Sequence, residues 1–267
     1  MIPARTGGVS ARITPYEMFL EPLEAVAFPA MREEAAQRGT DTRRRDRFVL
    51  LGHVGAALAQ FVSDDADPDA MEEYAEFVYQ GYQFWEYGCR LYAFSEDVTR
   101  ELTDEEYDVG NWVFAGPPAC YLQFPYQRLW ARVAAEAPYE PVDGCFVVVD
   151  DTEPAPGAGA HLRILLVLGL RADRPGVSLV SYRTDLTPTE VRELAHRPWR
   201  DDGHPYATAI PGGEKRGYKT MATTSELEAL VIRALHHLDV HHDALRAADG
   251  SSAEGQTHLA HVVVEHG

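Results

Sequence analysis

Hydrophobic positions in the first hundred residues recur every three or four residues, a spacing that predicts helices. Residues 45–62 fit one such helix, whose apolar face carries Phe48, Leu51, Val54, Leu58 and Phe61. A longer helix is predicted to open at Asp67 and to continue as far as Tyr92. An earlier helix is expected to begin at Thr14, because Glu17 stands at the spacing of a capping box.

The hydrophobic period changes after about Gly110. Short apolar segments with turn residues between them then predict strands, at 120–124, 145–149, 162–170 and 177–182. The uninterrupted run from Ile164 to Leu168 is typical of a strand buried on both faces. The turn signal Arg174-Pro175-Gly176 predicts an antiparallel hairpin with the following strand.

Helical patterns return between and after these strands. A short helix is predicted around 127–135, another from Thr187, and a last one from Ser225 to about Gly250, with a closing strand at 259–264. The sequence therefore predicts an α+β fold, in which an N-terminal helical part precedes a mainly antiparallel sheet packed by helices. The change of period divides the chain into regions 1–110 and 111–267, with one continuous domain as the alternative.

Charge and composition narrow the function classes. Among 267 residues, 42 acidic side chains oppose 24 basic ones and give a net charge of -18. Such a chain repels phosphate backbones and anionic membranes, so nucleic-acid binding is not expected. An apolar run long enough for a membrane span is missing, and MIPARTGG does not have the pattern of a secretory signal. With three scattered cysteines, these features predict a cytoplasmic protein.

A histidine-rich segment, 236–243, is the most conspicuous polar feature. His237 and His241 are one helical turn apart and share a face, and Asp239 is a nearby carboxylate. Imidazole and carboxylate suit a divalent transition metal, which is the one cofactor that the sequence suggests. The alternative is a solvated face, in which histidines near a helix C-terminus are favoured by the helix dipole.

A basic loop precedes the last predicted helix. It contains Lys215, Arg216 and Lys219 among glycines, but Tyr218 stands where a phosphate loop needs Lys followed by Ser or Thr. Nucleotide hydrolysis is therefore not expected. The loop favours binding of an anion or small molecule, as in a sensor, with an inert surface loop as the alternative.

Aromatic residues are unusually dense between 74 and 94. They exceed what one helical face can bury, and Tyr and Trp are common in protein contacts. Tyr82, Trp85 and Tyr92 are therefore candidates for contact with a partner, and internal packing is the alternative. The run Arg43-Arg44-Arg45-Asp46-Arg47 is interpreted as the polar entrance to a helix or as a grip on an acidic surface.

Enzyme signatures are sparse in this chain. It has no GxSxG nucleophile motif and no identifiable acid pair. We therefore predict a non-catalytic cytoplasmic interaction or accessory protein, with a protein partner or self-association. The segment 119–151 has the general character of accessory proteins of bacterial chromosomes or mobile elements. The alternatives are a metal-dependent hydrolase that uses the histidines and the anion or small-molecule sensor.

Overall fold

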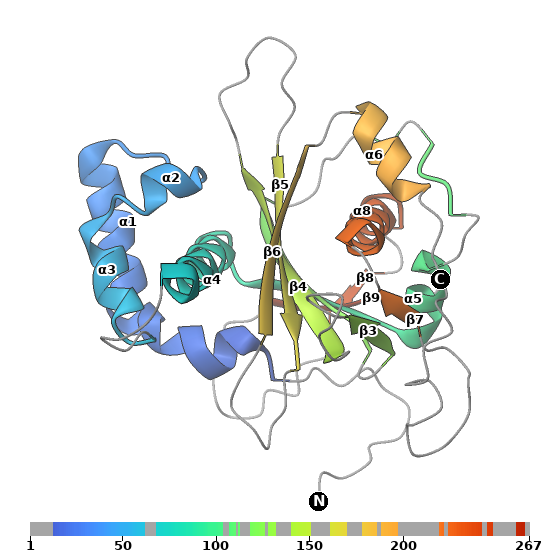
Figure 1. Cartoon of the computed structure of the whole chain (residues 1–267), viewed down its shortest axis with the longest axis horizontal. Helices are drawn as coiled ribbons and strands as arrows, with labels where there is room; N and C mark the ends of the chain where they lie inside the picture. The colour runs from blue at the N-terminus through green and yellow to red at the C-terminus, as the bar shows by residue number, and fades with distance from the viewer. Residues whose placement is uncertain are drawn as a thin grey trace, which may run out of the picture.

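A mixed sheet with helices on both faces forms the centre of the chain (Figure 1). The computed structural model describes residues 13–61, 68–103, 107–110, 112, 118–125, 128–131, 140–150, 161–169, 178–185, 188–196, 219–221, 224–241, 245–247 and 260–264. The strands among them are β1 Arg90–Phe94, β2 Ala119–Gln123, β3 Leu129–Ala131, β4 Glu140–Asp150, β5 His161–Leu168, β6 Ser178–Asp185, β7 Lys219–Met221, β8 Leu245–Ala247 and β9 Ala260–Val264.

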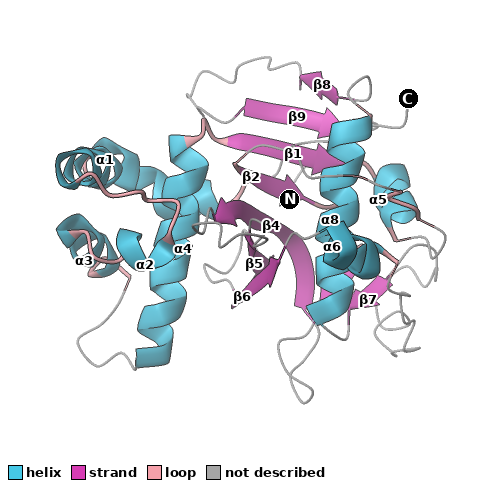
Figure 2. Ribbon diagram, turned by 90° about the horizontal axis from the view of Figure 1, so that it is seen from above, coloured by secondary structure: helices cyan, strands magenta, loops and turns pink. Residues whose placement is uncertain are grey.

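The strand order is β6-β5-β4-β2-β1-β9-β8 (Figure 2). A branch from β4 is formed by β3, which pairs with β4 and with β7. Five of the eight described pairings are antiparallel, while β1 runs parallel to β2 and β9, and β3 runs parallel to β7. Two strands can run parallel only when a long connection returns the chain to the end of the sheet at which the first strand began.

Two groups of helices cover the sheet (Figure 1). On one face lie the π-helix η1 Tyr16–Leu20, the 3₁₀ helix η2 Glu21–Ala25, α1 Ala27–Arg38, α2 Arg45–Phe48, α3 Gly52–Leu58 and α4 Pro68–Glu86. On the other face lie α5 Glu96–Leu102, α6 Pro188–Ala195 and α8 Thr224–Val240. Helix α4 packs directly on the sheet, and α1, α2 and α3 form an outer helical layer around it. Within the described part, no helix has both the length and the apolar character to cross a membrane.

The sheet separates two hydrophobic clusters. Successive residues of a strand point to opposite faces, so Leu165 and Val167 of β5 join the cluster under α4, while Ile164 and Leu166 join the one under α8. β5 is therefore buried on both faces, as its unbroken apolar run predicts. The α4 side is rich in aromatic rings that pack edge to face, such as Phe77 and Phe84 against Phe146 in the sheet.

Several sequence predictions are confirmed. The fold class is α+β, and β5 and β6 form the expected antiparallel hairpin. At Thr14 the capping box is present, because its Oγ1 accepts from the amide of Glu17 at 3.2 Å and its own amide donates to Glu17 Oε2 at 2.7 Å. The tail strand is also present as β9, but inside the sheet rather than at its edge.

Other predictions are wrong at element boundaries. The single helix expected over 45–62 is broken between α2 and α3 at residues 49–51, and the segment around 127–135 supplies the strand β3 in its described part. The last helix ends at Val240 instead of Gly250. In each case, the periodicity of hydrophobic residues does not show where tertiary packing ends a helix or makes a segment pair as a strand.

The long aromatic helix also ends earlier than predicted, at Glu86. Gly88 has a φ of +88°, which glycine adopts without a Cβ penalty, and the amide of Cys89 donates to the carbonyl of Phe84 at 2.8 Å. This turn places Tyr92 in β1 instead of on the helix. Gly81 lets η1 approach α4 closely, because a Cβ there would lie 2.2 Å from Leu20 Cδ1.

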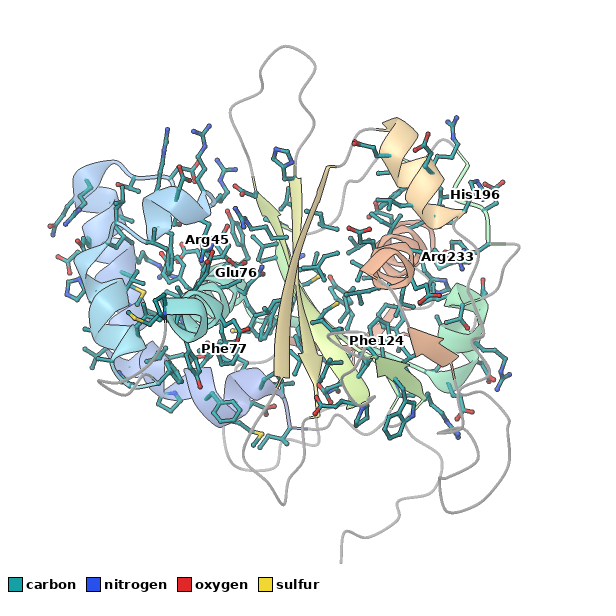
Figure 3. The ribbon with its side chains drawn as sticks, in the orientation of Figure 1. Arg45, Glu76, Phe77, Phe124, His196 and Arg233 are labelled. Atoms are coloured by element: carbon teal, nitrogen blue, oxygen red, sulfur yellow. The ribbon has the colours of Figure 1, made fainter. Side chains whose placement is uncertain are left out.

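A buried polar network joins the helical side to the sheet (Figure 3). Arg45 Nε of α2 lies 2.5 Å from Glu76 Oε2 of α4, and Arg163 Nε of β5 lies 2.8 Å from Asp150 Oδ2 of β4. Arg163 also approaches Glu76, at 3.9 Å. The two carboxylates are almost fully buried and each has a guanidinium partner, as buried charges require.

The division into 1–110 and 111–267 stays a prediction. Helix α4 and β1 precede residue 110, yet they share one cluster and one sheet with the later strands. This sharing favours the alternative of one continuous domain.

Candidate functional site

Three polar residues on and just beyond helix α8 lie on one stripe. Arg233, His237 and His241 follow each other at four-residue intervals, so they lie above one another along the helix. Arg233 and His237 are buried, at 0% and 2% exposure, whereas His241 is exposed just beyond the last helical residue. The rings of His237 and His241 are 4.5 Å apart between centroids. The prediction that these two histidines share a face is confirmed.

The third member of this cluster is Glu101 of α5. One donor atom each from Glu101, His237 and His241 lie within 4.8 Å of one another. Helix α5 is fixed at its start by Ser95, whose Oγ accepts from the amide of Val98 at 3.3 Å. Sequence reasoning missed Glu101, because nothing in the local pattern of α5 indicates which residue of α8 it approaches.

Asp239 lies elsewhere. Its Oδ2 accepts a hydrogen bond from Trp112 Nε1 at 2.8 Å, because residues two apart on a helix point to nearly opposite sides. His236 has other partners: its Nδ1 lies 3.0 Å from Tyr107 Oη, and its ring meets Trp112 edge to face. Burial lowers the pKa of His236, and nearby His241 adds to this effect.

The electrostatics of the cluster have two opposing parts. The C-terminal ends of α5 and α8 meet there, and helix C-termini carry partial negative charge that favours cations. Arg233 is a buried positive charge on the same stripe, and it donates to the carbonyls of Ala195 at 2.8 Å and Leu102 at 2.9 Å (Figure 3 labels it). The negative charge of the Glu101 carboxylate therefore makes the cluster more favourable for a cation.

The other histidines from residue 196 onward are not seen at this cluster. His196 lies beside Asp108, at 3.5 Å, on the α6 side. His204 and His258 lie outside the described residues, and His261 belongs to β9, whose side chains are not described. The cluster thus offers two imidazoles and one carboxylate, a set that suits zinc and other divalent transition metals.

The predicted anion-binding residues cannot be placed as a site. Lys215 and Arg216 lie outside the described residues. Lys219 begins β7, where it pairs with Leu129 of β3, and its side chain is likewise not described. Binding of an anion or small molecule by this loop stays a prediction.

The aromatic candidates lie mostly inside the fold. Tyr82 is 2% exposed and packs against Phe28 and Phe48, and Tyr92 is buried in β1. Trp85 is half-buried, with the Arg32 guanidinium 4.1 Å from its ring centroid. These positions favour internal packing for the two tyrosines and leave Trp85 at the rim of the surface.

Most of the exposed apolar side chains belong to the N-terminal helical part. Among the described residues, five of the six exposed large hydrophobic side chains precede residue 72. They are Ile13, Val26, Val49, Leu50 and Met71, and the sixth is Val240. Leu50 is 70% exposed and stands beside Val49 at the corner between α2 and α3. We refer to Val49 and Leu50 as the α2–α3 corner.

Hydrogen bonds from α1 hold the α2–α3 corner in place. Glu34 Oε1 accepts from the amide of Gly52 at 2.8 Å, and Glu34 Oε2 accepts from the amide of His53 at 3.1 Å. Arg38 Nη1 donates to the carbonyl of Leu50 at 3.2 Å, and Arg38 Nη2 lies 2.6 Å from Glu34. The exposed Leu50 is therefore presented on a fixed backbone.

Comparisons with known proteins identify no family. A scan of protein-family models and a search of curated proteins found no match. Among solved structures, the chain is similar to one titled "Crystal structure of AcrVA2", with a TM-score of 0.46 and 10% identity over 91% of this chain and 79% of that chain. A likeness at this level carries no inference about function.

Proposed function

We propose that this protein is a non-catalytic cytoplasmic interaction protein that docks a protein partner through its outer helical layer. The observation that carries the proposal is Leu50, an exposed apolar side chain on a corner that Glu34 and Arg38 fix. Isolated exposed apolar residues are ordinary on protein surfaces. A pre-organised one is a better anchor, because little conformational entropy is lost when a partner covers it.

The charge around the α2–α3 corner adds to this proposal. Residues 27–53 contain six arginines and four acidic side chains, in a chain of net charge -18, and glutamates of α4 pair with two of these arginines, Arg32 and Arg45. Arginine is enriched in the centres of protein interfaces, where its stem covers apolar surface. The partner we expect therefore offers an apolar pocket with an acidic rim.

Trp85 provides a second contact of the same kind. Arg32 is 52% exposed, stacks on the Trp85 ring and pairs with Glu86 at 2.7 Å. Trp and Arg are the residues most often found to dominate binding energy. Of the three aromatic candidates named from the sequence, Trp85 is the one that this proposal retains.

Site-specific photo-crosslinking tests the proposal. A photoreactive amino acid replaces Leu50 in one variant and Val240, which is 54% exposed on the opposite side of the sheet, in a control variant. We expect one discrete adduct from position 50 in cells and none from position 240. Mass spectrometry of the adduct identifies either another protein or a second copy of this chain.

Affinity for the identified partner then gives the decisive measurement. Leu50→Asp should weaken binding roughly 30-fold or more, as expected when about 2 kcal/mol of an interface anchor is lost. The thermal unfolding midpoint of the variant should match that of the parent, because Leu50 is exposed. Equal crosslinking at both positions, or unchanged affinity of Leu50→Asp, would refute docking at this corner.

A further inference from the structure

We infer that Glu101, His237 and His241 bind one divalent transition-metal ion, with Zn²⁺ the best match, and that the ion joins α5 to α8. This site is independent of the proposed docking function, because it lies on the opposite face of the sheet from the α2–α3 corner (Figures 1 and 2). Failure of either proposal leaves the other in place.

The donor set is the first argument. Zn²⁺ binds imidazole nitrogen and carboxylate oxygen at about 2.0–2.2 Å, and sites with two histidines and one glutamate are common. Ligand atoms of a tetrahedral zinc ion are therefore roughly 3.3 Å apart. The three donors already lie within 4.8 Å of one another. Closing the site requires an inward movement on the order of 1–1.5 Å.

Rotation of two of the three side chains can close the site. His241 is exposed and lies beyond the last residue of α8, and Glu101 is a half-buried side chain near the C-terminal end of α5 with several rotatable bonds. His237 is buried and fixed within α8, so it serves as the stationary ligand. A site of one rigid and two adjustable ligands can contract on an ion without a change in the position of either helix.

The placement of the cluster is the second argument. Glu101 is remote in sequence from His237 and His241, and the fold alone brings it to them. The site lies where the C-termini of α5 and α8 meet, and their partial negative charges add to the Glu101 carboxylate. These negative charges oppose the buried positive charge of Arg233, which already donates hydrogen bonds to the carbonyls of Ala195 and Leu102.

Three protein ligands leave a coordination position for water, in contrast to the four that close a structural zinc site. Because His241 is exposed, this position is accessible from solvent. A water bound there would have a lowered pKa, which is the chemistry that the hydrolase alternative needs. The inference concerns the ion itself, and its test does not depend on any reaction.

The test uses untagged protein that has been stripped with a chelator and titrated with Zn²⁺ and with Co²⁺. We expect binding of one ion per chain, a visible Co²⁺ spectrum of the tetrahedral type, and a higher unfolding midpoint with Zn²⁺. His241→Ala and Glu101→Gln should each weaken binding about 100-fold or more, because even outer-shell partners are worth 10–100-fold. Both variants should fold, because His241 is exposed and Glu101→Gln keeps the size and shape of the side chain.

His53→Ala is the matched control, since His53 is an exposed histidine that also lies beside a carboxylate, 2.7 Å from Glu34. It should bind Zn²⁺ as the parent does. Two results would overturn the inference: stripped parent protein that takes up no more Zn²⁺ than the His241→Ala variant, or an affinity that both ligand substitutions leave unchanged. In either case the cluster holds only protons and hydrogen bonds.

Discussion

Glu34 on α1 contacts His53 on α3 twice: one carboxylate oxygen accepts from the backbone amide at 3.1 Å and lies 2.7 Å from the ring Nδ1. The other oxygen accepts from the amide of Gly52. Glu34 thus satisfies the unpaired amides at the start of a helix that is remote from it in sequence. This single carboxylate caps the N-terminus of α3 and thereby holds the α2–α3 corner in place.

The capping role makes stability at this corner dependent on pH. Hydrogen bonds from Gly52, then from His53, lower the pKa of Glu34 from its ordinary 4.5 to about 2. A carboxylate with a lowered folded-state pKa stabilises the fold fully above pH 4.5, and this contribution is lost as the pH falls from 4.5 toward 2. Glu34→Gln should therefore unfold at a lower temperature than the parent at pH 7.

The difference between the two unfolding midpoints should shrink steadily between pH 4.5 and pH 2. Circular dichroism melts of both proteins at several pH values measure it. A difference that stays constant over this range would show that the charge of Glu34 does not cap α3.

Two glutamates pair with the same arginine and provide a second test. Glu76 is 4% exposed and lies 2.5 Å from Arg45 Nε, whereas Glu72 is 74% exposed and lies 3.5 Å from Arg45 Nη2. Glu76→Ala removes the buried partner of the half-buried Arg45 guanidinium, and breaking a buried pair typically costs about 3–5 kcal/mol. Glu72→Ala removes a surface pair worth about 0–1 kcal/mol.

Urea denaturation of the two variants compares them directly. The free energy of unfolding should fall much more for Glu76→Ala than for Glu72→Ala, with Arg45 unchanged in both. Equal losses would mean that the burial of Glu76 has no energetic consequence.

Two glycines provide a third test, with opposite expected signs. A Cβ at Gly144 in β4 would lie 2.1 Å from the backbone oxygen of Leu122, so Gly144→Ala should destabilise by about 1–3 kcal/mol or more. Gly55 lies within α3, and a Cβ there meets nothing within 4 Å. Gly55→Ala should stabilise by about 0.5–1 kcal/mol, since alanine is the better helix former.

Thermal and urea unfolding of the two alanine variants report both signs in one experiment. If Gly144→Ala were neutral, the close approach of β2 to β4 at Gly144 would not constrain the fold.

The candidate site shows how far a local pattern extends. His237 and His241 were predictable as a pair, because their spacing of four residues requires only that α8 be a helix. The carboxylate was predicted as Asp239, which is near in sequence, but the residue in the cluster is Glu101. Helical geometry turns Asp239 away to Trp112, and only the packing of α5 on α8 supplies its replacement.

The aromatic segment shows the same limit. Its density indicated that the rings needed more than one face to bury them, but it did not indicate what would cover them. In the fold, η1, α1 and α2 supply that cover, and Gly88 turns the chain so that Tyr92 enters the sheet. Most of the aromatic side chains that suggested a partner surface therefore pack inside the protein.

By itself, the sequence determined the α+β class, the strands β2, β4, β5 and β6, the hairpin of β5 with β6, and the capping box at Thr14. Each depends on hydrophobic period, turn residues or capping over a few neighbouring positions. The tertiary structure alone decided the place of β9 within the sheet, the meeting of Glu101 with His237, and the capping of α3 by Glu34. These features depend on contacts between segments that are distant in sequence. Such contacts stabilise the protein only when the whole core is packed.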